Sequence, residues 1–370
     1  MSVSSLPFLH GALAAVLPKL AAWRRDFHAH PEAGWTEFRT AALIIRRLRE
    51  LGYAIRMGEA ACASDRRMGV PSSAVLAAAR ERALEHGADA ELVAGMGDGY
   101  TGFWADLDCG PGPVTAFRFD MDCNEVAECA EESHRPVREG FASRWPGLMH
   151  ACGHDGHAAV GLGLAEVLVS IRRHLRGRIR LIFQPAEEGA RGALPMSEAG
   201  AVDGVDVLFG FHIGFKAEGP GSLICGTQGF LATTKRDVLF SGVPAHAGAA
   251  PEEGKDALLA ACSAVVNLHA ISRNGKGGTR IAVGRLEGGE ARNVIPASAR
   301  LFMETRGETT ELDAYMTAES ERILRASADL WGCACEWRTV GNSAGGGSSP
   351  ELARLIATVA EAMGGWKTVI

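Results

Sequence analysis

The chain has 370 residues, of which 47% are hydrophobic and 22% are charged, and its formal net charge is −6 at pH 7. This balance excludes a disordered or fibrous protein, and the net negative charge with scattered basic residues argues against a nucleic-acid-binding surface. The length predicts two domains. The nine cysteines form no regular framework, which favours a reduced, cytoplasmic location.

The N-terminal segment, residues 1–27, is expected to form an amphipathic surface helix. It has no basic residues before its apolar stretch and no clear cleavage site, so it does not resemble a signal peptide. No run in the sequence approaches the roughly 18 apolar residues that span a membrane. The segment 58–112 fits a strand–helix alternation less well, and we interpret it as an insertion with one helix at 72–87.

Three apolar runs predict buried strands that alternate with helices. They are PVTAFRFD at 113–120, RIRLIFQP at 178–185 and VDVLFGFHI at 205–213. Residues 154–175 predict a helix with Asp155 as its N-cap and basic residues in its last turn. This alternation predicts an α/β domain with a mostly parallel sheet and flanking helices.

The middle of the chain predicts a second domain of a different type. Strand-like runs at 233–242, 279–289, 298–307 and 333–340 enclose helical segments at 254–273 and 311–331. The resulting β-α-β-β-α-β order is that of a ferredoxin-like α+β fold. We therefore place one domain at 1–229 and 342–370 and an inserted domain at 230–341, followed by a Gly/Ser-rich hinge.

Residues with metal-binding and acid–base side chains lie near the ends of the first set of strands. They are Asp120, Asp122, Cys152, His154, Glu187, Glu188 and His212. Because the carboxyl ends of parallel strands share one edge of a sheet, we expect these side chains to meet there. A thiolate, imidazoles and carboxylates together suit a zinc- or manganese-type divalent ion. Taken singly, His212 could be a core histidine, Cys152 a small buried side chain and the Glu pair a solvated helix start, but their joint placement favours a metal site.

The adjacent residues Glu187 and Glu188 suggest that the two carboxylates have different roles. One carboxylate can hold a metal ion while its neighbour stays available as a general base that takes a proton from water. A site that only binds metal does not need the second carboxylate. The pair therefore favours a hydrolytic enzyme over a metal-binding module.

Seven segments resemble the M20 group of metal-dependent amidohydrolases. They are DFHAHPEAGWTEFRTA (26–41), FRFDMD (117–122), GLMHACGHDGHAA (147–159), LIFQPAEEGARGA (181–193), GFHIG (210–214), AHAG (245–248) and RNVIPASARLFMETRG (292–307). The cysteine-containing motif resembles the branch with aminoacylase-like, hippurate and auxin-conjugate hydrolases. The segment 141–165 and the insertion after residue 59 are most similar to hydrolases of p-aminobenzoyl-glutamate, a folate breakdown product.

The resemblance implies a zinc-exopeptidase-like catalytic domain with two divalent ions, Mn or Zn, in each subunit. The implied metal ligands are Cys152, which bridges the ions, His154, His212 and Glu188. Glu187 is then the general base, and Asp120 is a carboxylate that orients the site. The implied reaction is hydrolysis of the amide bond of N-acyl or N-aroyl amino acids.

In the inserted domain, which the resemblance identifies as a lid and dimerisation domain, three residues correspond to family positions. His246 corresponds to a residue that reaches a neighbouring subunit's site and stabilises the oxyanion. Asn293 and Arg306 correspond to residues that bind the substrate's carbonyl and carboxylate. Considered without the resemblance, His246 and Asn293 could be turn residues, and Arg306 could be a surface cation.

Several alternatives stay open from the sequence. The protein could be a general N-acyl-amino-acid or hippurate-type amidohydrolase or peptidase, and it could form a homodimer or pair with a homologous B-type subunit. Family members carry a last histidine ligand near the C-terminus, whereas this sequence has no histidine after His269. We therefore also expect that the sequence is either a fragment or a truncated, catalytically inactive metal-binding subunit.

Overall fold

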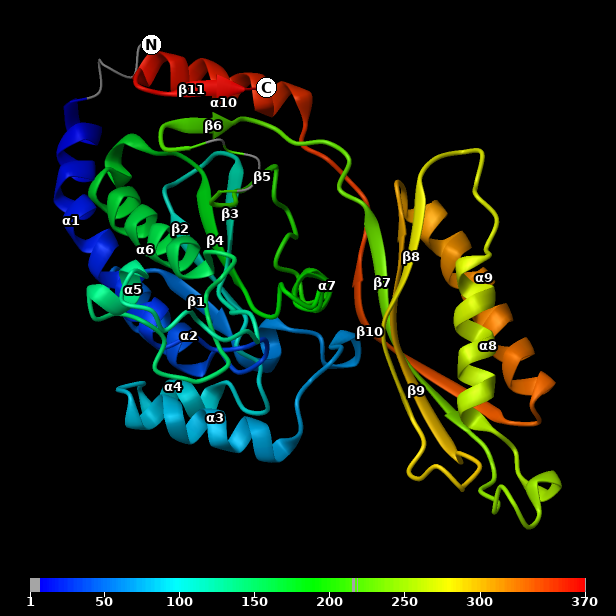
Figure 1. The fold of residues 1–370 in the computed structure, drawn as a ribbon. Helices are drawn as coiled ribbons and strands as arrows, with labels where there is room; N and C mark the ends of the chain where they lie inside the picture. Colours follow the sequence, from blue (N-terminus) through cyan, green and yellow to red (C-terminus); the bar gives the residue numbers. More distant parts are fainter. Residues whose placement is uncertain (1–6, 215–216, 218, 370) are drawn as a thin grey trace. The chain divides into compact units, whose positions relative to one another are not determined.

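The computed structural model describes residues 7–214, 217 and 219–369 of the chain (Figure 1). The chain divides into two compact units, one formed by residues 1–225 with 354–370 and one by residues 226–353. The sequence pattern predicts the boundaries of the inserted domain at residues 230 and 341.

The first unit is built on a five-stranded sheet with the strand order β1-β2-β4-β3-β5. Its strands are β1 (Ala54–Met57), β2 (Phe103–Asp108), β3 (Val114–Asp120), β4 (Arg178–Gln184) and β5 (Val207–Gly210). β3 pairs in parallel with β4 and β5, while β2 pairs antiparallel with β1 and β4. Only β2 therefore opposes the other four strands of this sheet, and the predicted mostly parallel α/β fold is confirmed.

Strand β2 corrects the interpretation of residues 58–112 as an insertion outside the strand–helix alternation. This segment does contain the predicted helix, α3 (Ser73–Glu85), but it also supplies β2, which is buried in the sheet between β1 and β4. The reason lies in the sequence FWADLD, whose Phe103, Ala105 and Leu107 face the main core while Trp104 faces the opposite side of the sheet. Residues 103–108 therefore belong to the framework of the fold.

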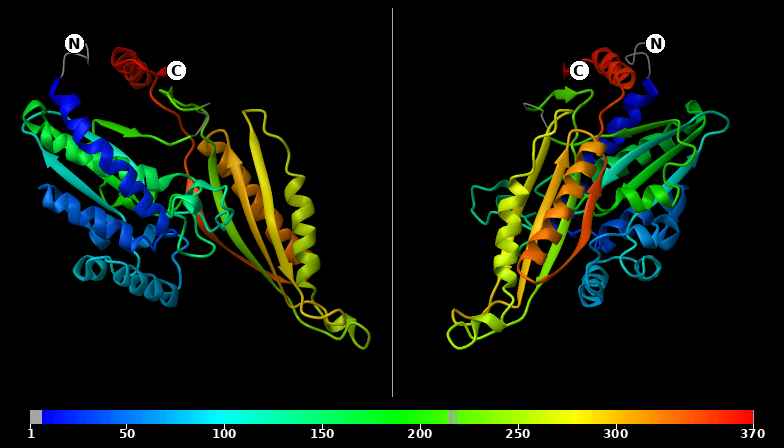
Figure 2. Two further views of the ribbon diagram at one scale, coloured as in Figure 1. Left: turned by 60° about the vertical axis from the view of Figure 1, so that its left-hand side comes forward. Right: turned by 90° about the vertical axis from the view of Figure 1, so that its right-hand side faces the viewer.

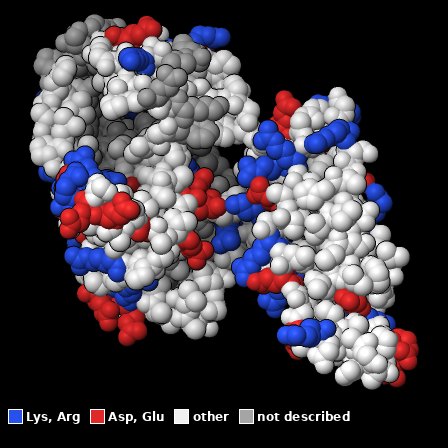
Figure 3. Space-filling view, viewed as in Figure 1, with Lys and Arg blue, Asp and Glu red and all other residues white. Residues whose placement is uncertain are grey.

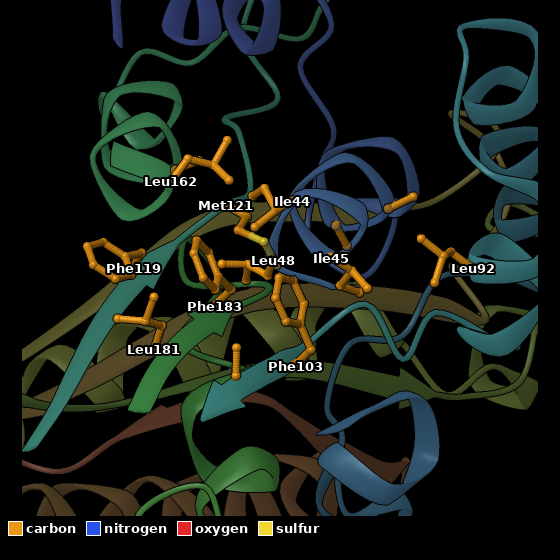
Figure 4. Packing of buried hydrophobic residues seen from close by; sticks show 14 of the residues in the cluster. Ile44, Ile45, Leu48, Leu92, Phe103, Phe119, Met121, Leu162, Leu181 and Phe183 are labelled. Atoms are coloured by element: carbon orange, nitrogen blue, oxygen red, sulfur yellow. The ribbon is translucent and has the colours of Figure 1, made fainter. Parts of the chain in front are cut away.

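Helices cover both faces of this sheet. The helices are α1 (Pro7–Ala29), α2 (Phe38–Glu50), α3, α4 (Ala90–Gly95), α5 (Arg135–Arg138), α6 (His154–Ser170) and α7 (Ala193–Glu198). Ile44, Ile45 and Leu48 of α2 and Leu162 of α6 pack on the face formed by residues such as Phe183 (Figure 4). Helix α7 packs on the other face, and α1 lies against the outer side of α6 (Figure 2).

The start of α6 differs from the expectation. Gly153 precedes the helix with a φ of 84°, a left-handed conformation that glycine adopts without strain, and Asp155 lies inside the first turn. The prediction that Asp155 is the N-cap was wrong. Its carboxylate instead forms a hydrogen bond with His28 and an ion pair with Arg24, both of α1, so it anchors one helix to the other.

The second unit has the predicted ferredoxin-like fold. Its elements in chain order are β7 (Ala232–Ser241), α8 (Ala257–His269), β8 (Thr279–Gly288), β9 (Ser298–Gly307), α9 (Thr310–Leu330) and β10 (Ala334–Ser343). The four strands form an antiparallel sheet with the order β10-β7-β9-β8. Both helices pack on one face of this sheet, which leaves the other face open within the unit (Figure 2).

The chain ends with α10 (Pro350–Met363) and a short strand, β11 (Lys367–Val369), which pairs in parallel with β6 (Ser222–Ile224). This small two-stranded sheet joins distant parts of the first unit. Among the described residues, no helix combines the length and the apolar character that would let it cross a membrane.

Candidate metal centre and active site

The carboxyl edge of the first unit's sheet gathers the side chains expected there. Asp120 ends β3, Glu187 and Glu188 follow β4, and His212 follows β5, while Cys152 and His154 stand at the start of α6. Three groups of side chains could each hold a metal ion, because the potential ligand atoms within each group lie no more than 4.8 Å apart. These groups are Cys152 with His154 and His212, His154 with Glu187 and Glu188, and Asp120 with His154 and His157. The structure therefore brings together the residues that the sequence pattern placed at the strand ends.

His154 is at the centre of this cluster and is completely buried. Its Nδ1 lies 2.9 Å from the backbone carbonyl oxygen of Asp122, so Nδ1 donates and the lone pair of the neutral ring is on Nε2. Burial opposes protonation of the ring, but the carboxylates of Asp122, Asp120 and Glu187 outweigh it and raise the pKa of His154 to about 9, so a bound cation would displace the Nε2 proton. Within the described residues, this buried Nε2 has no hydrogen-bond partner, although it lies 3.8 Å from Glu188 Oε1. A metal ion is the partner that fits such a nitrogen.

Cys152 and His212 face each other beside His154. His212 Nδ1 lies 2.9 Å from the carbonyl oxygen of Ile213, and its Nε2 lies 3.5 Å from Cys152 Sγ. Burial, together with the carboxylates of Glu188 and Glu187, raises the pKa of the Cys152 thiol to about 12. A thiolate at this position therefore requires a nearby cation, and the donor set of sulfur, imidazole and carboxylate suits a divalent metal.

Glu187 is partly buried, with 36% of its side chain exposed, and lies in a mixed electrostatic environment. Burial and the carboxylates of Asp120 and Asp122 raise its pKa, while the guanidinium of Arg118 and the ring of His154 oppose that shift. A carboxylate with a raised pKa accepts a proton more readily than an ordinary glutamate. Glu187 therefore has the environment that a general base needs.

Asp120 and Asp122 have different surroundings. Asp120 hydrogen bonds to Nδ1 of His157 and accepts a 2.6 Å bond from Arg118. Asp122 contacts the expected ligands, because its carbonyl oxygen binds the His154 ring and its Oδ2 accepts the backbone N–H of Glu188 at 3.0 Å. The sequence pattern put Asp122 at the strand end without giving it a role; the alternating spacing of Asp120 and Asp122 was the available signal.

His157 completes the support of this edge. Its Nδ1 is engaged with Asp120, and its Nε2 accepts the backbone N–H of Ile213 at 2.9 Å. Because both ring nitrogens are occupied, His157 serves as a link between α6 and the segment that carries His212.

The inserted unit brings two of its three candidate residues together. His246 forms a bridge with Val294, and the N–H of Ala247 donates to the carbonyl oxygen of Asn293 at 3.0 Å. His246 Nδ1 accepts the N–H groups of Gly248 and Ala249, each at 3.1 Å. Its proton is therefore on Nε2, which makes this ring a hydrogen-bond donor.

Arg306 lies at the other end of the same sheet. Asn293 precedes the first residue of β9, Ser298, whereas Arg306 is eight residues further along that strand, or about 27 Å at the usual rise. Arg306 pairs directly with Arg280 of β8 on the open face. The structure thus places His246 and Asn293 together, and Arg306 apart from them.

The comparison with protein families decides the classification. The profile of peptidase family M20/M25/M40 matches residues 116–369, which is more than half of the chain. The chain belongs to this family. The resemblance to M20 amidohydrolases found in the sequence is therefore confirmed, and the protein is a metal-dependent amidohydrolase by family.

Two curated relatives of this M20 chain are hydrolases from bacteria. It is 47% identical over 338 residues to the A-type subunit of p-aminobenzoyl-glutamate hydrolase from Escherichia coli strain K12, covering 91% of this chain and 77% of the relative. It is 46% identical over 346 residues to the indole-3-acetyl-aspartic acid hydrolase of Enterobacter agglomerans, covering 93% of this chain and 79% of the relative. Both relatives are named for cleaving a conjugate of an acidic amino acid.

Solved structures support the same family. An aminobenzoyl-glutamate utilization protein from Klebsiella pneumoniae has 39% sequence identity and a TM-score of 0.85, covering 98% of this M20 chain and 86% of its own. The YXEP protein of Bacillus subtilis, described as a dinuclear metal-binding M20 peptidase, has 25% identity and a TM-score of 0.60, with 96% and 82% coverage. The family and the second of these neighbours support a divalent-metal site, while the roles of individual residues stay predictions.

Proposed function

We propose that this protein hydrolyses the amide bond of N-acyl or N-aroyl derivatives of acidic amino acids, with p-aminobenzoyl-glutamate as the preferred substrate. The observation that carries the proposal is the buried Nε2 of His154, which lies among the Cys152, Glu188 and His212 donor atoms with Glu187 beside them. The names of the two curated relatives support the acidic amino acid.

Two divalent metal ions, Mn or Zn, would be held by Cys152, His154, Glu188 and His212. When bound, such ions polarise a substrate carbonyl and make water a better nucleophile. Glu187 takes the proton of the attacking water and gives it to the leaving amide nitrogen. Asp122 holds the His154 ring and the Glu188 amide in place, so it orients two ligands.

The open face of the inserted unit offers a place for a substrate carboxylate. Basic side chains gather on the side of this unit away from α8 and α9 (Figure 3). Three of the strand registers on this face set a cation opposite an acid, namely Lys235 with Glu304, Arg338 with Asp237 and Arg300 with Glu287. Arg338 forms an ion pair with Asp237 across the strands.

The pairing of Arg280 with Arg306 breaks this pattern. The Nε of Arg306 donates to Glu304 Oε1 at 2.7 Å, which offsets part of the repulsion between the two guanidinium groups. An anion bound beside both groups would offset the rest. Arginine binds carboxylates with two parallel hydrogen bonds. A substrate with two carboxylates, such as a glutamate or aspartate conjugate, can use both residues.

The positions of His246 and Arg306 favour a site shared between two chains. The strand between them spans about 27 Å, so one small substrate cannot contact both residues of the same unit. His246, whose Nε2 carries the proton, would donate to the oxyanion in the site of a second copy or of a homologous B-type subunit. Asn293 would accompany it, because the two residues lie on neighbouring backbone segments.

An assay of the metal-loaded protein with three substrates tests the proposal. We expect hydrolysis of p-aminobenzoyl-glutamate to have the highest kcat/KM, followed by indole-3-acetyl-aspartate, with hippurate much slower because it has a single carboxylate. Equal rates on hippurate would favour a general N-acyl-amino-acid hydrolase. No hydrolysis of any of the three, with metal bound, would favour a catalytically inactive metal-binding subunit.

A further inference from the structure

Glu37 is a buried carboxyl group that the proposed reaction does not use. It stands at the N-cap of α2 and is 0% exposed, but its side chain makes no capping hydrogen bond to that helix. The capping is done by Glu32, whose two oxygens accept the backbone N–H groups of Arg39 and Thr40 at 2.9 and 2.8 Å. The buried carboxyl of Glu37 therefore needs another explanation.

The side chain of Glu37 reaches the loop that follows β4. Its Oε1 accepts the backbone N–H of Ala186 at 2.8 Å, and its Oε2 is hydrogen bonded to the Thr101 hydroxyl at 2.6 Å. Ala186 directly precedes Glu187. Burial and the nearby carboxylate of Asp122 raise the pKa of Glu37 to about 8, so the group is largely a neutral carboxylic acid at pH 7. The carbonyl oxygen of a neutral acid still accepts an N–H.

The loop that Glu37 contacts has a strained backbone. Ala186 has a φ of 50° and Ala190 a φ of 56°, values that cost free energy for residues other than glycine. Two glycines permit the close packing around it, since a Cβ on Gly34 would lie 2.9 Å from the Cα of Ala186 and one on Gly192 would lie 1.8 Å from the oxygen of Pro185. Such a conformation persists only when surrounding contacts impose it.

Glu37 and Asp122 hold this segment at alternate amides. Glu37 binds the N–H of Ala186, and Asp122 binds the N–H of Glu188. Glu187 lies between the two fixed points. The direction of its side chain, and that of Glu188, therefore depends on both hydrogen bonds.

We propose that Glu37 is a positioning residue, which fixes the strained backbone at Ala186 and so aims Glu187 and Glu188 at the metal centre. The inference rests on the proposed function insofar as Glu188 is a metal ligand and Glu187 the base. The role requires a hydrogen-bond acceptor of this length and no charge. Glutamine at position 37 keeps that acceptor, and its amide can donate to Thr101, whereas alanine removes both.

Titration of the metal-free protein with Mn²⁺ tests the proposal on the wild type, Glu37→Gln and Glu37→Ala. We expect Glu37→Ala to weaken Mn²⁺ binding by roughly 10–100-fold, the usual effect of losing an outer residue that orients ligands. Glu37→Gln should restore affinity to within about threefold of the wild type. In the three-substrate assay, Glu37→Ala should lower kcat with little change in KM, because the substrate contacts are elsewhere.

Glu32→Ala is the matched control, since it also removes a fully buried glutamate that binds two backbone amides near α2. It should lower the thermal stability but leave Mn²⁺ affinity within about threefold of the wild type. If Glu37→Ala does not fold, Thr101→Val removes the hydroxyl that holds Glu37 and should weaken Mn²⁺ binding in the same direction. Wild-type Mn²⁺ affinity in Glu37→Ala overturns the proposal. If Glu37→Ala does not fold, wild-type Mn²⁺ affinity in a folded Thr101→Val overturns it. A loss of Mn²⁺ affinity in Glu37→Gln or Glu32→Ala as large as that in Glu37→Ala also overturns it.

Hydrogen exchange of the metal-free protein separates this inference from the proposed function. We expect the amide of Ala186 to exchange faster in Glu37→Ala than in the wild type and Glu37→Gln. If the wild type hydrolyses none of the substrates but this exchange pattern is found, the proposed function fails and the positioning role stands. If the wild type is active and the Ala186 amide is equally protected in all three proteins, the positioning role fails alone.

Discussion

Nδ1 of His154 lies 2.9 Å from the backbone carbonyl oxygen of Asp122, and this contact turns Nε2 of the same ring toward the cluster of metal-binding atoms. Asp122 also holds the backbone of Glu188 through its carboxylate. One residue therefore orients two of the proposed ligands, which come from different elements of the fold. We therefore expect metal binding to depend on this contact as well as on the proposed ligands themselves.

Asp122→Ala should weaken metal binding without removing a ligand. The His154 ring keeps its bond to the backbone carbonyl, but the Glu188 amide loses its acceptor. We expect the affinity for Zn²⁺ or Mn²⁺ to fall by roughly 10–100-fold, measured by titration of the metal-free protein. Wild-type affinity in this variant would contradict the orienting role.

Cys152→Ala should have a larger effect on metal content. It removes the proposed bridging ligand, so the loss should exceed that of Asp122→Ala. Elemental analysis of the purified protein measures it. Cys109→Ala is the control, because Cys109 is outside the cluster and should be replaceable without loss of metal. Full metal content in Cys152→Ala would remove the cysteine from the ligand set.

Arg280→Ala tests the two-arginine site for the substrate carboxylates. A hydrogen bond to a charged group contributes about 1.5–3 kcal/mol, so kcat/KM for p-aminobenzoyl-glutamate should fall by roughly 10–100-fold. The loss for hippurate should be smaller. Arg300→Ala, on the same open face but opposite Glu287, serves as the control and should leave both rates unchanged. An equal loss of kcat/KM on the two substrates would show that Arg280 does not bind the second carboxylate.

The ion pair of Asp26 with Arg39 predicts a pH dependence of stability. Burial alone would raise the pKa of Asp26, but hydrogen bonds from His30 and Arg39 lower it to about 2. A carboxylate with a lowered pKa stabilises the fold fully above its unfolded-state value, near 3.9, and loses this contribution as the pH falls toward 2.

Asp26→Asn should therefore destabilise the metal-free protein at pH 6 and have progressively less effect between pH 4 and pH 2. The cost at pH 6 should be about 1 kcal/mol or less, because the Asp26 side chain is 43% exposed and solvent screens the pair. Urea unfolding at several pH values measures it. A difference in unfolding free energy that stays constant over this range would contradict the ion-pair account.

Local patterns in the sequence were enough to predict much of the fold. The apolar runs around Phe119 and Phe183 predicted the parallel strands, and their ends predicted the places of Cys152, His154, Glu187 and His212. The ferredoxin-like unit followed from the alternation in residues 230–341. These features depend on periodicity within a few residues, which the sequence shows directly.

The features that were missed depend on contacts between distant segments. Strand β2 is short and lies in a segment whose other elements do not alternate with strands, so its place in the sheet was not evident. Asp155 has the residue type of an N-cap, but its partner His28 is 127 residues away and holds it inside the helix. Glu37 reaches Ala186 across 149 residues. No local pattern indicates such a bond.

The most direct test of the central claim compares the wild type with Glu187→Gln at equal metal content, using p-aminobenzoyl-glutamate as substrate. Glutamine keeps the size of the side chain but cannot take a proton from water. We expect the variant to bind metal as the wild type does and to lose roughly 10²–10⁴-fold in kcat. Wild-type kcat in a fully metal-loaded Glu187→Gln would contradict the assignment of Glu187 as the base, and with it the proposed mechanism.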